Sequence, residues 1–200
     1  MQFNRMTLLA GAALALCSGL AQAGNSTAKL TADNEFWLYS GNLTGSSLQY
    51  VGEGHSWGTA FSFNFTVAAG DYLYVLANDG GPPKSWQGVF NTPAGALHSN
   101  DTDWLGSGVA NGTNVVTQAL IAGATWSAPT LSSYGWGNVV GDVSAKWIWM
   151  VDQYAGPQTA LFRSAAPVMA AVPEPETYMM LIGGLGVLGL VTRRRKSVDA

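Results

Sequence analysis

Cysteine and positive charge are the scarcest features of this sequence of 200 residues. The single cysteine, Cys17, lies close to the N-terminus, so no disulfide can stabilise the chain beyond it. Between residues 24 and 171 there are four basic side chains against nine acidic ones, a net charge of −5. This balance excludes the basic footprint of a nucleic-acid-binding protein, so we expect no nucleic acid as a partner.

Recognisable catalytic and metal-binding motifs are also absent. His55 and His98 are the only histidines, and they do not form the His-x-x-x-His spacing of a metal site. We expect both to be surface or structural residues. The sequence contains no Gly-x-Ser-x-Gly nucleophile elbow and no phosphate-binding loop. We therefore predict that the protein is not an enzyme and has no resident cofactor or metal.

Three aspartates leave alternatives open. Asp101 and Asp103 stand two residues apart beside Trp104, where a pair of carboxylates could act as acid and base on a glycosidic bond. Solvation of a loop, or contact with Ca²⁺ through hard oxygen ligands, is the simpler interpretation. Asp79 lies in Asn78-Asp79-Gly80-Gly81 and is expected to be a turn residue, with cation binding as its alternative.

Hydrophobic alternation predicts β-structure throughout the middle of the chain. Every second residue of Phe61–Val67 is apolar, which is the period of a half-buried strand within the expected segment 60–67. Further strands are expected at Glu35–Tyr39, Tyr72–Ala77, Asn114–Ala119, Lys146–Val151 and Thr159–Arg163. Turn-forming residues separate them at Ser40–Asn42, Gly52–Gly54, Ala69–Asp71 and Asn78–Pro83. The spacing favours one all-β domain, a β-sandwich or barrel, without a long amphipathic helix.

Tryptophan is abundant, with eight residues. Three of them lie in expected strands and are predicted to be core residues: Trp37, Trp147 and Trp149. The other five lie among Gly, Ser and Asn, in expected loops, and are either packing residues or candidates for stacking on a ligand: Trp57, Trp86, Trp104, Trp126 and Trp136. An indole has a flat apolar face and one polar N–H, which suits a sugar ring or a partner surface.

The N-terminus has the features of a secretory signal peptide. Arg5 supplies the positive region, Met6–Cys17 an apolar region, and Ala21–Ala23 a site with small residues at its first and third positions. We expect cleavage between Ala23 and Gly24, which makes residues 1–23 a signal peptide.

The C-terminus has a second terminal signal. Residues 172–176 read Val-Pro-Glu-Pro-Glu, and the residues from 177 to 192 carry no charge. This apolar segment is short for a bilayer core, which needs roughly 20 residues, but the flanking arginines can reach the interface. The basic cluster that follows comprises Arg193, Arg194, Arg195 and Lys196, at the start of a tail of residues 193–200. Because Lys and Arg are retained on the cytoplasmic side, we expect the C-terminus inside and the preceding domain outside.

This order of features resembles the PEP-CTERM sorting signal of Gram-negative bacteria. The resemblance implies recognition by exosortase, a membrane-embedded protease or transpeptidase, with Pro173, Glu174 and Pro175 as the recognition element of the sorting-signal segment from Val172 to Glu176. Proline fixes its own φ and disfavours helix in the preceding residue, so this segment should be extended and accessible. The implied route is transient insertion in the inner membrane, followed by cleavage and delivery to the surface. An ordinary C-terminal membrane anchor is the alternative.

Residues 24–171 show a second resemblance, to galactose-binding-like jelly-roll domains. Asp33–Tyr39 is similar to their D-x-x-x-x-L-Y-V-N-G strand and turn, although Ser40–Asn42 replaces the Val-Asn-Gly turn. Similar short segments occur at Ala77–Pro83 with Trp86–Phe90, at Ala145–Trp149 and at Leu161–Arg163. The resemblance implies a jelly-roll-like sandwich.

Three functions remain in view for a chain of signal peptide (1–23), β-sandwich (24–171) and sorting signal (172–200). The expected one is an exported, non-enzymatic protein of the cell surface or extracellular polysaccharide. The first alternative is a carbohydrate-binding module that recognises the cell's own polysaccharide. The second is a membrane-anchored glycoside hydrolase that uses Asp101 or Asp103.

Overall fold

The computed structural model describes residues 24–133, 136–170, 180 and 182–185. The chain divides into two compact units, Met1–Ala170 and Ala171–Ala200. In the second unit the described residues are helical. Among the residues that the structure describes, no helix combines the length and the apolar character that a membrane span requires. The expected apolar segment 177–192 lies mostly outside the described residues.

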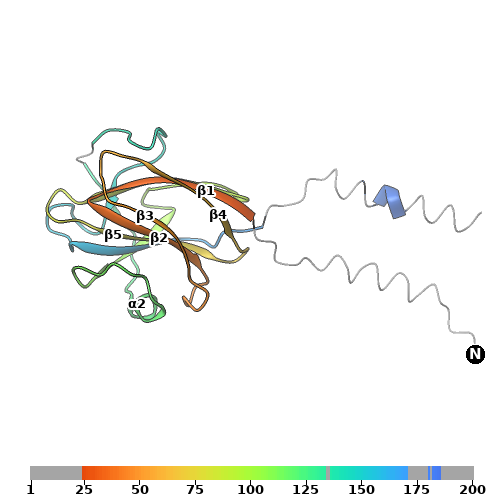
Figure 1. The fold of residues 1–200 in the computed structure, drawn as a ribbon, viewed down its shortest axis with the longest axis horizontal. Helices are drawn as coiled ribbons and strands as arrows, with labels where there is room; N and C mark the ends of the chain where they lie inside the picture. The colour runs from red at the N-terminus through yellow and green to blue at the C-terminus, as the bar shows by residue number, and fades with distance from the viewer. Residues whose placement is uncertain (1–23, 134–135, 171–179, 181, 186–200) are drawn as a thin grey trace, which may run out of the picture. The chain divides into compact units, whose positions relative to one another are not determined.

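Strands dominate the first unit (Figure 1). In chain order the elements are β1 (Gly24–Asp33), β2 (Glu35–Gly41), β3 (Gln49–Gly54), β4 (Phe61–Val67), β5 (Tyr72–Asn78), β6 (Ser85–Thr92), β7 (Gly95–His98), β8 (Trp104–Val109), α2 (Gln118–Gly123), β9 (Thr130–Leu131), β10 (Ile148–Trp149) and β11 (Thr159–Ser164). The described strands form two antiparallel sheets. Sheet A has the order β4-β1-β6-β10-β9, with β7 paired to β6, and sheet B has the order β3-β2-β5-β11-β8. The predicted all-β sandwich is confirmed.

Alternation along the strands decides which side chains form the core between the sheets. In β1, Ala28, Leu30 and Ala32 are buried in this core, so Lys29 and Thr31 point to the opposite, outer face of sheet A. The predicted alternation of β4 is also found, with its phenylalanines packed against the same core and its polar residues exposed. Large aromatic rings fill the centre: Phe36, Trp86, Phe90, Trp104, Trp149 and Phe162.

The predicted turn at Gly52–Gly54 is wrong, because these residues belong to β3. Gly54 faces the rings of β2 and β4, where an added Cβ would come within 2.5 Å of both Phe36 and Phe61. The glycines of β3 therefore make room for aromatic rings. Glycine within a strand can mark such a close approach instead of a turn.

A second, smaller apolar cluster lies on the outer face of sheet B. Trp37, Tyr39 and Tyr74 point outward from the sheet and pack with Val116 and Ile121. The segment around α2 thus covers the outer face of sheet B, on the side away from β1 (Figure 1). The sandwich has one covered outer face in addition to its central core.

Two predicted strands differ from the structure. Asn114–Ala119 is not a strand, because Thr117 caps a helix by accepting a hydrogen bond from the N–H of Leu120 over 3.1 Å. Lys146–Val151 forms only the two-residue strand β10. Val151 has a φ of 59°, in the left-handed region, which is incompatible with continued pairing.

Candidate functional site

The two histidines belong to separate polar clusters at the surface. His55 lies 3.5 Å from Glu35 through Nδ1 and 3.2 Å from Glu53 through Nε2. The hydrogen bond with Glu53 raises the pKa of His55, and the same bond lowers the pKa of Glu53. All three side chains are well exposed, so water and salt screen their charges. These ion pairs therefore contribute little to the stability of the fold.

His98 is the last residue of β7, directly before the loop that leads to β8. Its Nε2 lies 3.2 Å from the carboxylate of Asp142. Two hydrogen bonds lower the pKa of Asp142: the larger effect comes from the backbone N–H of Ser144 and the smaller one from His98. The backbone N–H of His98 donates to Asp103 over 3.1 Å. His98 therefore connects two loops.

Asp101 and Asp103 do not form an acid and base pair in this arrangement. Asp103 also accepts a hydrogen bond from the side chain of Asn100 over 2.9 Å, while Asp101 is exposed in the turn. The side-chain oxygen of Asn100 accepts from the backbone N–H groups of Thr102 and Asp103. These bonds shape the loop, and Asp103 acts in them as a structural acceptor.

Asp79 is a turn residue, as predicted, and it is completely buried. Its Oδ1 accepts a hydrogen bond from the N–H of Gly81 over 2.6 Å, whereas its Oδ2 has no hydrogen-bond partner among the described residues. Burial is the main cause that raises the pKa of Asp79 to about 7. The hydrogen bond from Gly81 and the charge of Lys84 oppose this rise, and the nearby Asp33 contributes to it. A buried carboxyl of this kind is neutral over much of the acidic range.

Calcium binding by the aspartates is not supported by a cluster of ligands. Ca²⁺ takes six to eight oxygen ligands in proteins. The described part of the chain contains no group of three or more Asp, Glu, His or Cys side chains that could hold a metal ion. The ammonium of Lys84 beside Asp79 also disfavours a cation there. Calcium stays a prediction from the sequence alone.

The structure contradicts the loop assignment of two tryptophans. Trp86 lies in β6 and Trp104 in β8, and both are completely buried. Their rings meet edge to face with centroids 4.9 Å apart. Neither can stack on a ligand, so these two predicted stacking residues are wrong. Their neighbours in sequence are small and polar, but the core that surrounds each ring comes from other strands of the fold.

Trp126 has a different role on the outer face of sheet B. Its ring lies 4.7 Å from the guanidinium carbon of Arg163, and the ring of Tyr72 lies 4.9 Å from the same atom. Such cation–π contacts stabilise by about 0.5 to 2 kcal/mol. Trp126 therefore packs against Arg163 and helps to hold the segment around α2 on sheet B.

Two of the predicted stacking tryptophans meet on the other side of the molecule. Trp57 is 46% exposed, and its ring centroid lies 5.7 Å from that of the partly buried Trp136, at an interplanar angle of 37°. Behind them, Trp136 contacts the buried Trp147 with centroids 4.8 Å apart. We call Trp57 and Trp136 the aromatic pair. Trp57 is the exposed ring of the pair, and the buried ring of Trp147 packs beneath Trp136.

Hydrogen bonds to the outer face of sheet A hold the two loops that carry this pair. Thr31 of β1 donates to the carbonyl oxygens of Ser56 and Trp57 over 2.8 and 2.9 Å. Gln87 of β6 donates to the carbonyl of Ala145 over 3.0 Å, and its own oxygen accepts from the N–H of Val139 at the same distance. Both polar side chains are buried beneath the loops. The sequence offered no motif for either, because a single Thr or Gln in a strand has no local signature.

Two hollows lie along this outer face. One, of about 360 Å³, is lined by the loop beside the aromatic pair, with Asn138, Val143, Lys146 and Trp147 among its residues. The other, of about 630 Å³, lies over β1, β4 and β6 and is lined mainly by amide and hydroxyl side chains: Asn25, Thr27, Asn64, Thr66, Asn91 and Thr92. The outer face of sheet A is therefore polar and hollowed, with the aromatic pair on it.

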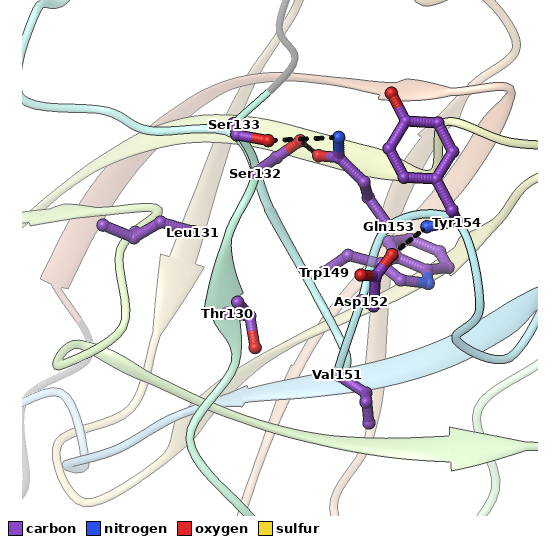
Figure 2. Close-up of a pocket in the computed structure, with 9 residues that line it drawn as sticks. All are labelled: Thr130, Leu131, Ser132, Ser133, Trp149, Val151, Asp152, Gln153 and Tyr154. Atoms are coloured by element: carbon purple, nitrogen blue, oxygen red, sulfur yellow. Dashed lines mark hydrogen bonds between the residues drawn. The ribbon is translucent and has the colours of Figure 1, made fainter.

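A third hollow, of about 180 Å³, lies between β9 and the turn after β10 (Figure 2). Gln153 points toward Ser132 and Ser133 and bonds to both. Asp152 accepts a hydrogen bond from the backbone N–H of Tyr154 over 2.6 Å. These polar groups hold the turn itself. Among the described residues that line this hollow there is no histidine, cysteine or lysine.

Comparison with known proteins identifies the tail. Residues 171–196 match the model of the PEP-CTERM protein-sorting motif. The chain carries a PEP-CTERM sorting motif. No curated protein and no solved structure matches the chain, so the resemblance of the sandwich to galactose-binding-like domains has no further support.

The motif supports an exported surface protein that is sorted by exosortase. It implies a C-terminal signal of the membrane-anchor type. The predicted recognition segment 172–176, the basic cluster 193–196 and the predicted signal residue Ala23 lie outside the described residues. Gly24, the expected first residue after cleavage, is the first described residue and begins β1.

Proposed function

We propose that the sandwich is a non-catalytic component of the cell surface or its extracellular polysaccharide, to which the tail delivers it before being removed. The match of residues 171–196 to the sorting motif carries this proposal. The compact unit that contains the sandwich ends at Ala170, directly before the motif. Cleavage within residues 172–176 would therefore leave every described strand intact.

The positions of the polar side chains support a non-catalytic role. The carboxylates of Asp103 and Asp152 accept backbone hydrogen bonds that shape their loops. His55 forms an exposed network with two glutamates at the edge of sheet B. In none of these places does the structure bring a nucleophile, a base and an electrophilic group together, which catalysis requires.

Processing predicts two new termini. In a host with an active exosortase, intact-mass measurement should show a protein that begins at Gly24 and ends within residues 172–176. Pro173→Ala combined with Pro175→Ala should abolish this C-terminal cleavage, because both substitutions release φ in the extended segment. Pro167→Ala, which alters a proline before the motif, is the matched control and should be cut normally.

Retention of the tail would contradict the proposal. If the unsubstituted protein kept residues 177–200 in that host, the tail would act as an ordinary anchor. Cleavage at the same position in a host from which exosortase had been deleted would assign the cut to another protease.

The aromatic pair favours one more specific role, carbohydrate binding. Its exposed member, Trp57, lies on the same face as the amide-rich and hydroxyl-rich hollow, and a sugar ring needs both stacking and hydrogen bonds. We propose that this face binds the polysaccharide around the cell. The loops beneath the pair are held by buried hydrogen bonds from Thr31 and Gln87, so the surface is pre-organised.

We expect Trp57→Ala to weaken binding to the host's own polysaccharide by about tenfold or more, since an exposed indole at the centre of a binding site contributes at least about 1.4 kcal/mol. Titration of the tryptophan fluorescence would measure this affinity. Trp126→Ala removes the same kind of side chain from the segment that covers sheet B, and it should leave the affinity unchanged. Equal affinities of Trp57→Ala and the unsubstituted protein would remove the aromatic pair from the site.

A further inference from the structure

We propose that the outer face of sheet A binds an acidic polysaccharide, one that carries carboxylate groups, and that Lys29 and Lys146 select it. This inference rests on the proposed carbohydrate binding and adds the chemical class of the ligand.

The few basic side chains of the domain differ in their availability to a ligand. Residues 24–170 contain four basic and nine acidic side chains. Lys84 is buried and donates to the carbonyl of Gly156 over 2.8 Å, so its charge is satisfied internally. Arg163 is held between Tyr72 and Trp126 on sheet B. The two cations that remain for a ligand are Lys29 and Lys146.

Both of these lysines lie around the loop that carries Trp136. Lys29 points outward from β1, and its Nζ lies 3.6 Å from the position that a Cβ on Gly141 would take. Lys146 is exposed and lines the hollow beside the aromatic pair, where its Nζ donates to the carbonyl of Val143 over 2.9 Å. The two ammonium groups therefore flank one loop.

Along β1, Lys29 lies between the amide-rich hollow and the loop that carries Trp57. Lys29 and Thr31 are two residues apart on the same face of β1, roughly 7 Å, and Thr31 bonds to the carbonyl of Trp57. In the other direction, two residues from Lys29, Thr27 lines the amide-rich hollow and accepts a hydrogen bond from Asn91 over 3.2 Å. Along β1 the outer face thus presents hydroxyl and amide groups, then a cation, then the contact with the loop that carries the exposed Trp57.

This order matches the chemistry of an acidic polysaccharide. Ring faces stack on indole, hydroxyl groups bond to amides and hydroxyls, and carboxylates pair with ammonium groups. The nearest acid in the same loop, Asp142, accepts hydrogen bonds from the N–H of Ser144 and pairs with His98. Because the domain is otherwise acidic, clustering of both available lysines on this face creates a local site for anions.

The test compares polymers that differ only in charge. Polygalacturonate and alginate would each be titrated, beside their fully esterified forms, into the full-length chain in a neutral detergent at low ionic strength. We expect the acidic forms to bind about tenfold more tightly than the esters, and added salt to reduce this preference. Lys29→Met combined with Lys146→Met should remove the preference, so that the acidic forms bind no more tightly than the esters. Trp57→Ala should weaken binding to both forms.

Each other outcome has a defined meaning. Equal binding of acidic and esterified polymers by the unsubstituted protein, still weakened by Trp57→Ala, would overturn the selection of acidic ligands but keep carbohydrate binding. Binding of none of the four polymers would overturn both. A preference for acidic polymers that the double lysine variant retained, or that Trp57→Ala left intact, would place the charge recognition elsewhere. Near-ultraviolet circular dichroism would confirm that each variant folds.

Discussion

Trp86→Ala should lower the free energy of unfolding by about 4 kcal/mol, whereas Trp57→Ala should lower it by about 1 kcal/mol or less. Trp86 is completely buried and contacts the rings of Trp104 and Phe162, with centroids 4.9 and 5.4 Å away. Truncation removes this aromatic packing and leaves a cavity in the centre of the sandwich. Trp57 is half exposed, so its removal uncovers little buried surface.

Urea denaturation of the full-length chain in a mild detergent, followed by far-ultraviolet circular dichroism, measures both values. Trp86→Phe is the matched control, because it keeps a ring in the core and removes an indole N–H that has no hydrogen-bond partner among the described residues. It should cost much less than the alanine substitution. Similar losses for Trp57→Ala and Trp86→Ala would contradict the division into core and surface tryptophans.

The second large effect concerns the dependence of stability on pH, which we assign to Asp79. Burial raises the pKa of Asp79 to about 7 in the folded protein, while an unfolded aspartate loses its proton near pH 4. Between these values the folded state binds more protons than the unfolded state, so the stability falls as the pH rises. The contribution of Asp79 is fully present below about pH 4 and is lost as the pH passes through 7. The expected loss is about 2 to 4 kcal/mol.

Asp79→Asn isolates this effect. The amide oxygen can still accept the hydrogen bond from Gly81, but the side chain no longer ionises. We expect the variant to be close to the unsubstituted protein at pH 4 and more stable at pH 8, as measured by urea denaturation at each pH. Burial also raises the pKa of Asp33 and of Asp71, so only the difference between the two profiles is assigned to Asp79. Parallel profiles would show that another group titrates.

Local patterns in the sequence predicted the strands whose side chains alternate strictly. Phe61–Val67 alternates because one face packs on the core and the other faces water, and the structure forms β4 there. β1 had no such pattern, because its inward residues include two alanines and therefore differ little in hydrophobicity from the outward Thr31 and the aliphatic stem of Lys29. β6 was not predicted either, because Gln87 is buried beneath a loop and breaks the expected alternation.

The candidate site could be predicted only in part. The sequence suggested Trp57 and Trp136 as stacking residues together with Trp86 and Trp104, since all four stand among small and polar residues. The structure separates them: the first two meet on the outer face of sheet A, and the other two meet in the core. Composition around a residue does not reveal which distant strand packs against it.

The sequence by itself indicated export and surface sorting, because the sorting motif at residues 171–196 combines a Pro-Glu-Pro segment, an apolar run and a basic cluster, and all three are local properties. It also determined the all-β class, since alternation is a property of neighbouring residues. Only the tertiary structure decided which tryptophans are exposed, that Asp79 is buried, and that Lys29 and Lys146 flank one loop. These features depend on contacts between strands and loops that are far apart in the chain, which no local pattern encodes.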